Sequence, residues 1–355
     1  TAVIICLAGG ILITVFGILF SHNILALMNT KDELIDGAVL YLRIYLLGMP
    51  ALGLYNFGNA VLSAAGDTKR PLYYLAFAGV VNVILNLFFV IVCHLGVAGV
   101  ALASMISQFI SAFLILRALL TGKEKYCLRL SEIRFDKRKA VGILQIGIPS
   151  AFQYSLFAFA NLFVQSSVNS FDHVLVEGNS AAANADPLVY DMMAAFYTAC
   201  SSFIAQNFGA RKKKRILQTY LICLFYSFIT SLLLGVGIYL ARYPFLYLFT
   251  SDKAVVEAGI TRLSIMALSY SASAFMDASI AASRGLGKTA VPTFVVVMGS
   301  CVFRIIWIYT IFAYFHTIQS LYILYVFSWG ITAIAENIYF FHVYRHTLTE
   351  KKELC

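Results

Sequence analysis

The sequence predicts an all-α, polytopic membrane protein with about ten transmembrane helices. Of its 355 residues, 61% are hydrophobic and 12% are charged, whereas a soluble domain carries about 25% charged residues. The mean hydropathy is +0.83, and uncharged apolar runs long enough to cross a bilayer recur along the whole chain. These runs lack the alternation of barrel strands, so helices, which satisfy their own backbone hydrogen bonds in lipid, are the expected elements.

Ten candidate spans follow one another, each long enough to cross about 30 Å of hydrocarbon. They are 2–28, 38–64, 71–93, 97–119, 141–169, 183–208, 217–241, 256–283, 290–314 and 319–344. Every second loop is rich in Lys and Arg, and these loops hold most of the 26 basic residues. The positive-inside rule therefore places the C-terminus in the cytoplasm. The basic run at 211–215 then indicates a topology anchor rather than a nucleic-acid contact.

The longest polar stretch, 121–139, is predicted to be a cytoplasmic linker between two lobes. From about Ser131 it is expected to form an amphipathic surface helix with Ile133 and Phe135 towards lipid. The predicted parts of the chain are the remainder of an N-terminal lobe with four helices (1–120), the linker, a C-terminal lobe with six helices (140–347) and a cytoplasmic tail (348–355).

An internal repeat relates the two lobes. Gly66 and Pro71 match Gly287 and Pro292, and each pair stands in a short turn where glycine ends one helix and proline opens the next. The offset spans an even number of helices, so the repeat is parallel, which suggests alternating access with substrate held near the midplane. Since 141–208 then lacks a first-half counterpart, we expect two helices before Thr1 and an intact fold of six plus six helices. Chance similarity of two apolar segments is the alternative.

The chain resembles the MATE (multidrug and toxic compound extrusion) family of the bacterial type. The resemblance covers 41–72, 95–110, 146–171 and 178–215, and its most specific motif is QNFGA at 206–210, followed by basic residues. It begins at what would be the family's third helix, so it implies an N-terminally truncated member of a twelve-helix, two-lobe fold. It also implies export of organic, often cationic, compounds against inward H⁺ or Na⁺.

Three ionisable residues lie deep within the predicted spans: Asp277 in the eighth, Arg304 in the ninth and Glu336 in the tenth. Charged groups at bilayer depth are costly and mark functional positions. The resemblance matches Asp277 to an acidic residue implicated in cation coupling, and such a carboxylate exchanges a proton or coordinates Na⁺ through oxygen. We therefore predict a cation-coupling set of Asp277, Glu336 and Arg304, with H⁺ or Na⁺ as coupling ion, Asp277 as the candidate Na⁺ ligand, and no other metal or cofactor.

An ion pair is the structural alternative for these charges, because Arg304 could reach either acid across neighbouring helices. This alternative stays open at Asp277 and is favoured at Glu336, and it makes Arg304 an organiser of the acids rather than a substrate ligand. Asp191 opens the sixth span and is interpreted as a solvated group near the outer surface. The acidic position of the family's first helix would precede Thr1.

Polar and aromatic residues of two spans are predicted to line a substrate cavity. They are Gln153, Tyr154, Phe157, Asn161, Gln165, Asn82 and Asn86. Asn161 and Gln165 stand four residues apart and share a helix face, as do Asn82 and Asn86. Aromatic rings bind planar cations through cation–π contacts. Hydrogen bonds that hold neighbouring spans together are the alternative role of the polar residues.

Together with the repeat, the resemblance implies a secondary active transporter that exports organic, often cationic, compounds by antiport with H⁺ or Na⁺. We expect a multi-pass monomer in the bacterial plasma membrane whose partners are small compounds and the bilayer, not nucleic acid. The alternative is a flippase for a lipid-linked oligosaccharide or other lipid-linked precursor, but its pyrophosphate favours a cationic cavity and only Arg304 lies deep. An enzyme is not expected, because the seven cysteines are widely spaced and no metal-ligand spacing occurs.

Overall fold

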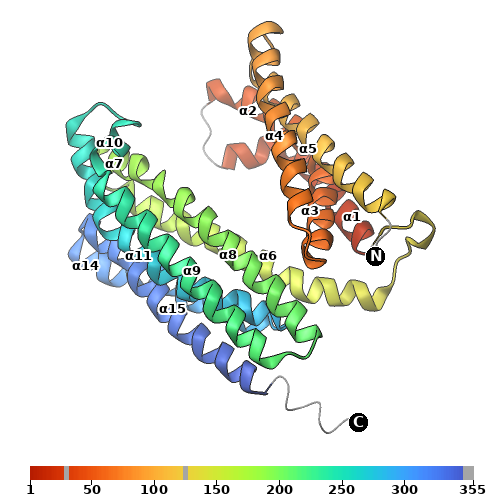
Figure 1. The fold of residues 1–355 in the computed structure, drawn as a ribbon. Helices are drawn as coiled ribbons and strands as arrows, with labels where there is room; N and C mark the ends of the chain where they lie inside the picture. Colours follow the sequence, from red (N-terminus) through yellow and green to blue (C-terminus); the bar gives the residue numbers. More distant parts are fainter. Residues whose placement is uncertain (28–31, 123–126, 347–355) are drawn as a thin grey trace. The chain divides into compact units, whose positions relative to one another are not determined.

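The computed structural model describes residues 1–27, 32–122 and 127–346, and these residues form helices without strands (Figure 1). The predicted all-α fold is therefore confirmed, whereas the predicted tail 348–355 lies outside the described residues. In chain order the elements are α1 (Ala2–Leu27), α2 (Asp32–Leu46), α3 (Met49–Ala64), α4 (Lys69–Leu87), η1 (Phe88–Val92), α5 (Gly96–Thr121), η2 (Leu130–Glu132), α6 (Lys137–Val168), α7 (His173–Ala183), α8 (Ala185–Gly209), α9 (Lys213–Leu240), α10 (Arg242–Tyr247), α11 (Lys253–Gly285), α12 (Ala290–Val296), η3 (Val297–Val302), α13 (Phe303–Trp307), η4 (Ile308–Phe312), α14 (Ala313–Phe315) and α15 (Ile318–His346).

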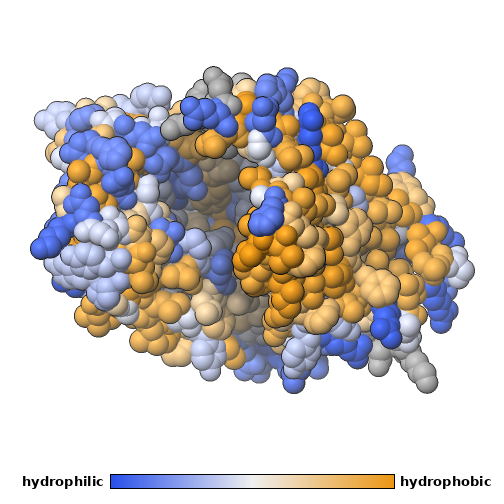
Figure 2. Space-filling model, turned by 90° about the horizontal axis from the view of Figure 1, so that it is seen from above, coloured by the Kyte–Doolittle hydropathy of each residue, from blue (hydrophilic) through white to orange (hydrophobic). Residues whose placement is uncertain are grey.

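The described residues contain nine helices long and apolar enough to span a membrane, or ten if the bent pair α2 and α3 counts as one span. Large hydrophobic side chains are exposed along these helices, and broad hydrophobic areas cover the face shown in Figure 2. Such a surface is stable against lipid rather than water. The prediction of about ten spans therefore agrees with the structure.

The predicted span 38–64 contains a bend, because the chain turns by 44° between α2 and α3. Pro50 stands in the first turn of α3 and has no N–H to donate to the carbonyl of Leu46. The hydroxyl of Thr14 in α1 donates to that carbonyl instead, at 2.6 Å. A residue far away in the sequence thus satisfies the broken backbone, as a bend at bilayer depth requires.

A similar arrangement occurs in α6, which contains Pro149. The proline leaves the carbonyl of Gln145 without its helical donor, and the hydroxyl of Thr289 lies 3.4 Å from this oxygen. Thr289 is 5% exposed, so its hydroxyl also gains a partner in a buried position.

The predicted surface helix from about Ser131 is also wrong. Only the short 3₁₀ turn η2 forms there, and α6 begins at Lys137. The backbone that follows η2 is bound elsewhere: Thr1 Oγ1 donates to the carbonyl of Arg134, and the N–H of Asp136 donates back to Thr1 Oγ1, both at 2.9 Å. Asp136 accepts from the N–H of Lys139 at 3.1 Å, and this hydrogen bond lowers the pKa of its carboxyl.

The chain divides into two compact units, residues 1–143 and 144–355, so the division falls inside α6. In the first unit α1 packs against α2 and α3, and α5 packs against α2, α3 and α4. In the second unit α11 packs against α7, α8, α9 and α15. Among the candidate spans in the described part of the chain, α11 is the most buried.

The glycine turns of the predicted repeat share one geometry. Gly66 and Gly287 have φ of 91° and 77°, which glycine adopts without strain. In the first turn Asp67 N–H donates to the carbonyl of Leu62, and in the second Lys288 N–H donates to Ser283 O at 3.0 Å. Each glycine also donates to the carbonyl three residues before it. Both turns are therefore Schellman motifs, which supports the predicted role of glycine in ending these helices.

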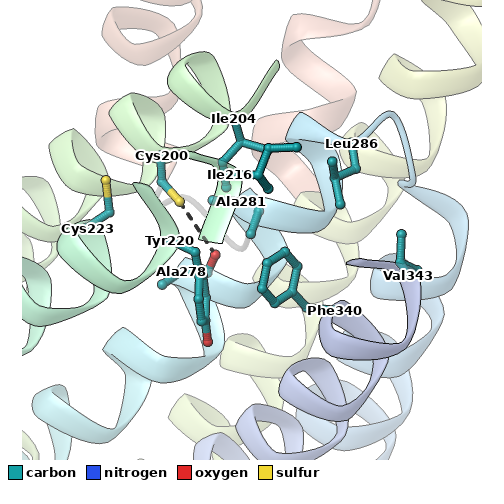
Figure 3. Packing of buried hydrophobic residues seen from close by; sticks show 11 residues of the cluster. Cys200, Ile204, Ile216, Tyr220, Cys223, Ala278, Ala281, Leu286, Phe340 and Val343 are labelled. Carbon is teal, nitrogen blue, oxygen red and sulfur yellow. Dashed lines mark hydrogen bonds between the residues drawn. The ribbon is translucent and has the colours of Figure 1, made fainter. Parts of the chain in front are cut away.

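A cluster of buried residues joins α8, α9, α11 and α15 near one end of the second unit (Figure 3). Tyr220 lies at its centre, with its ring centroid 4.4 Å from that of Phe340. Its hydroxyl donates to Asn337 Oδ1 at 2.5 Å and lies 3.1 Å from Ser279 Oγ. Cys200 contacts the carbonyl of Ala278 at 3.9 Å. These contacts fix α11 against its neighbours and so position the residues on its other side.

Candidate functional site

The second unit contains a cavity of about 550 Å³ that α6, α8 and α11 line together with residues of α7, α13 and α15. Five of the seven predicted cavity residues lie in its wall: Gln153, Tyr154, Phe157, Asn161 and Gln165. All five belong to α6. The helix face that Asn161 and Gln165 were predicted to share therefore lines a cavity.

Asn82 and Asn86 lie in the other unit, on α4. Asn86 Nδ2 donates to Asn82 Oδ1 at 3.1 Å. Asn82 Nδ2 in turn lies 3.5 and 3.4 Å from the hydroxyls of Ser104 and Ser107 on α5. These contacts fit the alternative role of the pair, which is to hold two helices together by hydrogen bonds.

One face of α11 supplies a row of polar side chains. Arg262, Tyr270 and Asp277 line the cavity, and Arg284 follows near the end of the helix. Tyr270, Asp277 and Arg284 are each seven residues apart, which returns them to one side of a helix. The rise from Arg262 to Arg284 is about 33 Å at 1.5 Å per residue, so the row follows most of a membrane span.

An ion pair stands towards the beginning of α11. Arg262 Nη2 donates to Asp186 Oδ2 at 2.5 Å, and the other oxygen of Asp186 accepts from the hydroxyl of Tyr270. Arg262 Nη1 donates to Oδ1 and to the backbone carbonyl of Asn179, at 3.1 and 3.2 Å. The Arg262 side chain is 8% exposed and that of Asp186 is 37% exposed. The charge of Arg262 is therefore compensated within the unit.

A second network stands at the end of α11. Arg284 Nη1 donates to the hydroxyl of Tyr197, and Nη2 donates to Gln153 Oε1 at 2.9 Å. The same oxygen of Gln153 lies 3.3 Å from the hydroxyl of Thr293. Gln153, Tyr197 and Thr293 come from α6, α8 and α12. Arg284 thus connects four helices.

Asp277 lies between these networks and is half-buried. Its carboxylate faces the cavity, and no hydrogen bond or ion pair joins it to another residue that the structure describes. The charge of Arg284 acts on it from further along the helix. Such a carboxylate is stabilised by whatever occupies the cavity, whether a proton, a cation or water.

Glu336 on α15 is fully buried and does not belong to the cavity wall. Neither of its carboxylate oxygens has a hydrogen-bond partner among the described residues. The charge of Arg284 acts on Glu336 as it does on Asp277. A buried ionised carboxylate without a partner is strongly disfavoured, so this group is neutral in this conformation or binds a cation.

Arg304 does not pair with either acid, which corrects the predicted alternative. No ion pair in the described part of the chain includes it. Its Nη1 donates to Asn161 Oδ1 at 2.8 Å, and its Nε lies 3.4 Å from Ser328 Oγ. Arg304 is thus held by neutral groups and cannot be the direct organiser of Asp277 and Glu336. It lies in α13, between the π-helical segments η3 and η4.

Asp191 is exposed and also lines the cavity. Aromatic side chains complete much of the wall: Tyr154, Phe157, Tyr190, Tyr197, Tyr270, Tyr322, Tyr325 and Trp329. The ring of Trp329 is tilted against those of Tyr325 and Tyr270, whose centroids lie 5.5 and 6.3 Å from its own. Among the described residues, no group of three or more His, Cys, Asp or Glu side chains could hold a metal ion.

Sequence reasoning missed the networks of Arg262 and Arg284. For Arg284 the available signal was its spacing of seven residues from Asp277, which places both residues on one helix face. Both arginines fall near the predicted ends of a span, where basic residues usually lie in water. The partners Asp186, Tyr197 and Gln153 come from other helices, and a spacing rule cannot identify such contacts.

The chain was compared with known families and proteins. The family model MatE matches residues 1–88 and 149–310. The probable multidrug resistance protein YpnP of Bacillus subtilis is 33% identical over 201 residues, which cover 56% of this chain and 44% of that protein. The probable multidrug resistance protein NorM of Thermotoga maritima is 23% identical over 300 residues, 82% of this chain and 63% of that protein. The chain thus spans less than two thirds of the length of these relatives.

A solved structure shows the same fold. It is the outward-facing conformation of a multidrug resistance MATE family transporter of the MOP superfamily. Its TM-score is 0.90 at 21% sequence identity, and the match covers 98% of this chain and 78% of that one. At this identity the similarity concerns the fold alone.

Proposed function

The chain belongs to the MatE family, and on this premise we propose that the protein is a secondary transporter that exports organic, often cationic, compounds by antiport with H⁺ or Na⁺. The cavity of the second unit is where the compound binds. Asp277 carries the coupling ion. The curated relatives named above are probable multidrug resistance proteins, which supports a broad substrate range.

The single observation that carries the proposal is the state of Asp277. It lies in the wall of a cavity of about 550 Å³, the size of a site for a small organic molecule. It has no hydrogen bond or ion pair to the residues described. Because an unpaired carboxylate within a membrane span favours a counter-charge, H⁺, Na⁺ and a cationic substrate compete for it. Competition for one group is what antiport requires.

Glu336 is proposed as a second ion-carrying group. It is fully buried, and both of its oxygens lack a hydrogen-bond partner within the described residues. Arg284 acts electrostatically on both acids, so a change of charge at one acid alters the field at the other through this shared cation. We propose that Glu336 holds a proton while Asp277 faces the cavity.

The wall of the cavity suits flat organic compounds. Tyr325 and Trp329 offer ring faces, which attract cations and stack on aromatic systems. Gln165 and Asp191 add polar groups that can accept hydrogen bonds from a substrate. Few of these contacts require one fixed ligand geometry, which is consistent with a broad specificity.

The remaining parts of the proposal concern placement and assembly. We propose a multi-pass monomer in the bacterial plasma membrane, and the distribution of basic loops supports a cytoplasmic C-terminus. The flippase alternative is not favoured. A pyrophosphate needs several cationic groups, whereas Arg262 is already neutralised by Asp186.

Ion-driven efflux tests the proposal directly. Vesicles that contain the protein are loaded with ethidium, and efflux is followed by fluorescence under a pH gradient and, separately, under a Na⁺ gradient. We expect efflux under one of the two gradients, and the effective gradient identifies the ion. Asp277→Asn should abolish gradient-driven efflux, whereas the control Asp191→Asn, an exposed acid in the same wall, should retain most of it.

Two results would reject parts of this proposal. Absence of efflux in the wild-type protein under both gradients rejects antiport of ethidium. Gradient-driven efflux that is unchanged in Asp277→Asn moves the coupling to another residue, with Glu336→Gln as the next variant to measure.

A further inference from the structure

Arg304 carries a buried charge that no carboxylate compensates. Its residue exposure is 2%, and the polar groups that it contacts, Asn161 and Ser328, are both neutral. No ion pair among the described residues includes it, and its titratable neighbours Tyr325 and Cys301 are not carboxylates. An isolated ion in a low-dielectric interior is costly unless an opposite charge approaches it.

Two aromatic rings cover part of the guanidinium. Its central carbon lies 4.5 Å from the ring centroid of Tyr325 and 5.5 Å from that of Phe157. Cation–π contacts of this kind stabilise a guanidinium but leave its net charge in place. Arg304 is therefore held firmly in one orientation and still carries an uncompensated positive charge.

One nitrogen of Arg304 is free to bind a ligand. Nη1 and Nε have protein partners. Nη2 forms no hydrogen bond with a described residue, and it is not fully buried. Since Arg304 is part of the cavity wall, Nη2 reaches the surface of the cavity. Its two N–H groups can therefore donate to a molecule inside.

The surroundings of Nη2 define the ligand. A guanidinium donates to carboxylate oxygens through short, charge-assisted hydrogen bonds. Tyr325 and Trp329 also line the cavity, with their ring centroids 5.5 Å apart, and they offer a stacking surface for an aromatic ring. We propose that Arg304 is an anion-binding subsite that takes the carboxylate of an aromatic organic acid, whose ring packs against Tyr325 and Trp329.

This inference rests on the proposed function in one respect, namely that the cavity holds the transported compound. It extends the substrate class from organic cations to aromatic compounds that carry an acid group. Asp277 lies in the same wall but forms no ion pair with Arg304. The cavity therefore has separate positions for an acidic group and for a cation.

Binding of matched probes tests the subsite without any transport step. The probes are 1-naphthoate and its neutral analogue 1-naphthamide, which share one ring system. The chain has two tryptophans, and Trp329 lines the cavity, so quenching of tryptophan fluorescence in the purified protein reports occupancy. The wild-type protein should bind naphthoate roughly tenfold or more tightly than naphthamide, because a hydrogen bond to a charged group is worth about a tenfold change or more.

Variants then assign the difference to Arg304. Arg304→Gln should weaken the binding of naphthoate by roughly tenfold and change the affinity for naphthamide by less than about twofold. Arg304→Lys keeps the charge and should retain part of the preference. The control Arg242→Gln removes an arginine that stacks on Tyr239 and Tyr243 away from the cavity wall, and it should change neither affinity.

Three outcomes would overturn the inference. The first is equal affinity of the wild-type protein for the two probes. The second is an Arg304→Gln variant that keeps the preference for naphthoate. The third is an equal loss of affinity for both probes in that variant. If Arg304→Gln does not fold, Arg304→Lys decides, because a preference for naphthoate that is unchanged in this variant would also overturn the inference. Failure of ethidium efflux with selective naphthoate binding would reject the proposed antiport and leave the subsite standing.

Discussion

The ion pair of Asp186 and Arg262 gives a prediction whose size follows from the structure. Asp186→Asn keeps the shape of the side chain but removes its charge, which leaves Arg262 buried without a counter-ion. Loss of one partner from a fully buried pair costs about 3–5 kcal/mol, whereas an exposed pair contributes about 0.2–1 kcal/mol. The Arg262 side chain is 8% exposed but that of Asp186 is 37% exposed. Because water screens the acid, we expect a loss of about 2 kcal/mol.

A double-mutant cycle measures the interaction. Free energies of unfolding are determined by titration with a denaturing detergent for the wild-type protein, Asp186→Asn, Arg262→Gln and the double variant. The double variant no longer buries an unpaired charge, so we expect a coupling energy of about 1–2 kcal/mol. The control pair Arg129 and Glu132 is more exposed, at 74% and 67% of the side chains, and should give about 0.5 kcal/mol or less.

One result of the double-mutant cycle would contradict the role of Asp186. A coupling energy for Asp186 and Arg262 no larger than that of the control pair would show that water screens both pairs equally. The compensation of Arg262 by Asp186 would then be wrong, and Arg262 would join Arg304 as an uncompensated charge of the cavity wall.

Three further predictions concern single positions. Thr289→Val should cost about 1–2 kcal/mol, because the Gln145 carbonyl loses the Thr289 hydroxyl as a donor, and the cost should vanish in a Pro149→Ala background, where the backbone N–H returns. Gly287→Ala should cost about 1 kcal/mol, because φ is 77° and a left-handed conformation strains any residue with a side chain. Glu336→Gln should change stability by less than about 1 kcal/mol, because an unpartnered buried carboxyl already resembles the neutral amide.

The same unfolding titration checks these three changes. If the cost of Thr289→Val is unchanged in the Pro149→Ala background, the Thr289 hydroxyl does not compensate for the N–H that Pro149 lacks. The added methyl group at Gly287 meets no atom within 4 Å, so a cost far above 1 kcal/mol would point to a source other than backbone strain. A large loss in Glu336→Gln would mean that Glu336 is ionised and bound to a cation.

The apolar runs of the sequence were sufficient to predict a helical membrane protein and the approximate spans, because spanning length and backbone hydrogen bonding in lipid allow few alternatives. The bend at Pro50 was missed although proline is visible in the sequence. Whether a proline bends a span depends on a partner for the freed carbonyl, and that partner, Thr14, lies on another helix. The surface helix near Ser131 was wrongly predicted because Thr1 binds the backbone that follows it.

The α6 half of the cavity was predictable, since polar residues four apart on an apolar helix mark one face. The partner of Arg304 was not predictable from the sequence. A buried arginine is expected to pair with an acid, and the sequence offered Asp277 and Glu336, but the structure holds Arg304 with Asn161 and ring faces instead. Neutral partners on separate helices leave no pattern in the sequence.

The central claim is that one carboxylate, Asp277, binds either the coupling ion or a cationic substrate. The most direct measurement is the affinity of the purified protein for ethidium as a function of pH and of Na⁺ concentration, in the wild-type protein and in Asp277→Asn. If the two ligands compete, each must weaken the other by the same factor. We predict that ethidium binding in the wild-type protein weakens as pH falls, by up to about tenfold per pH unit, or as Na⁺ rises, and that Asp277→Asn removes this dependence. The same dependence in both proteins would contradict the account.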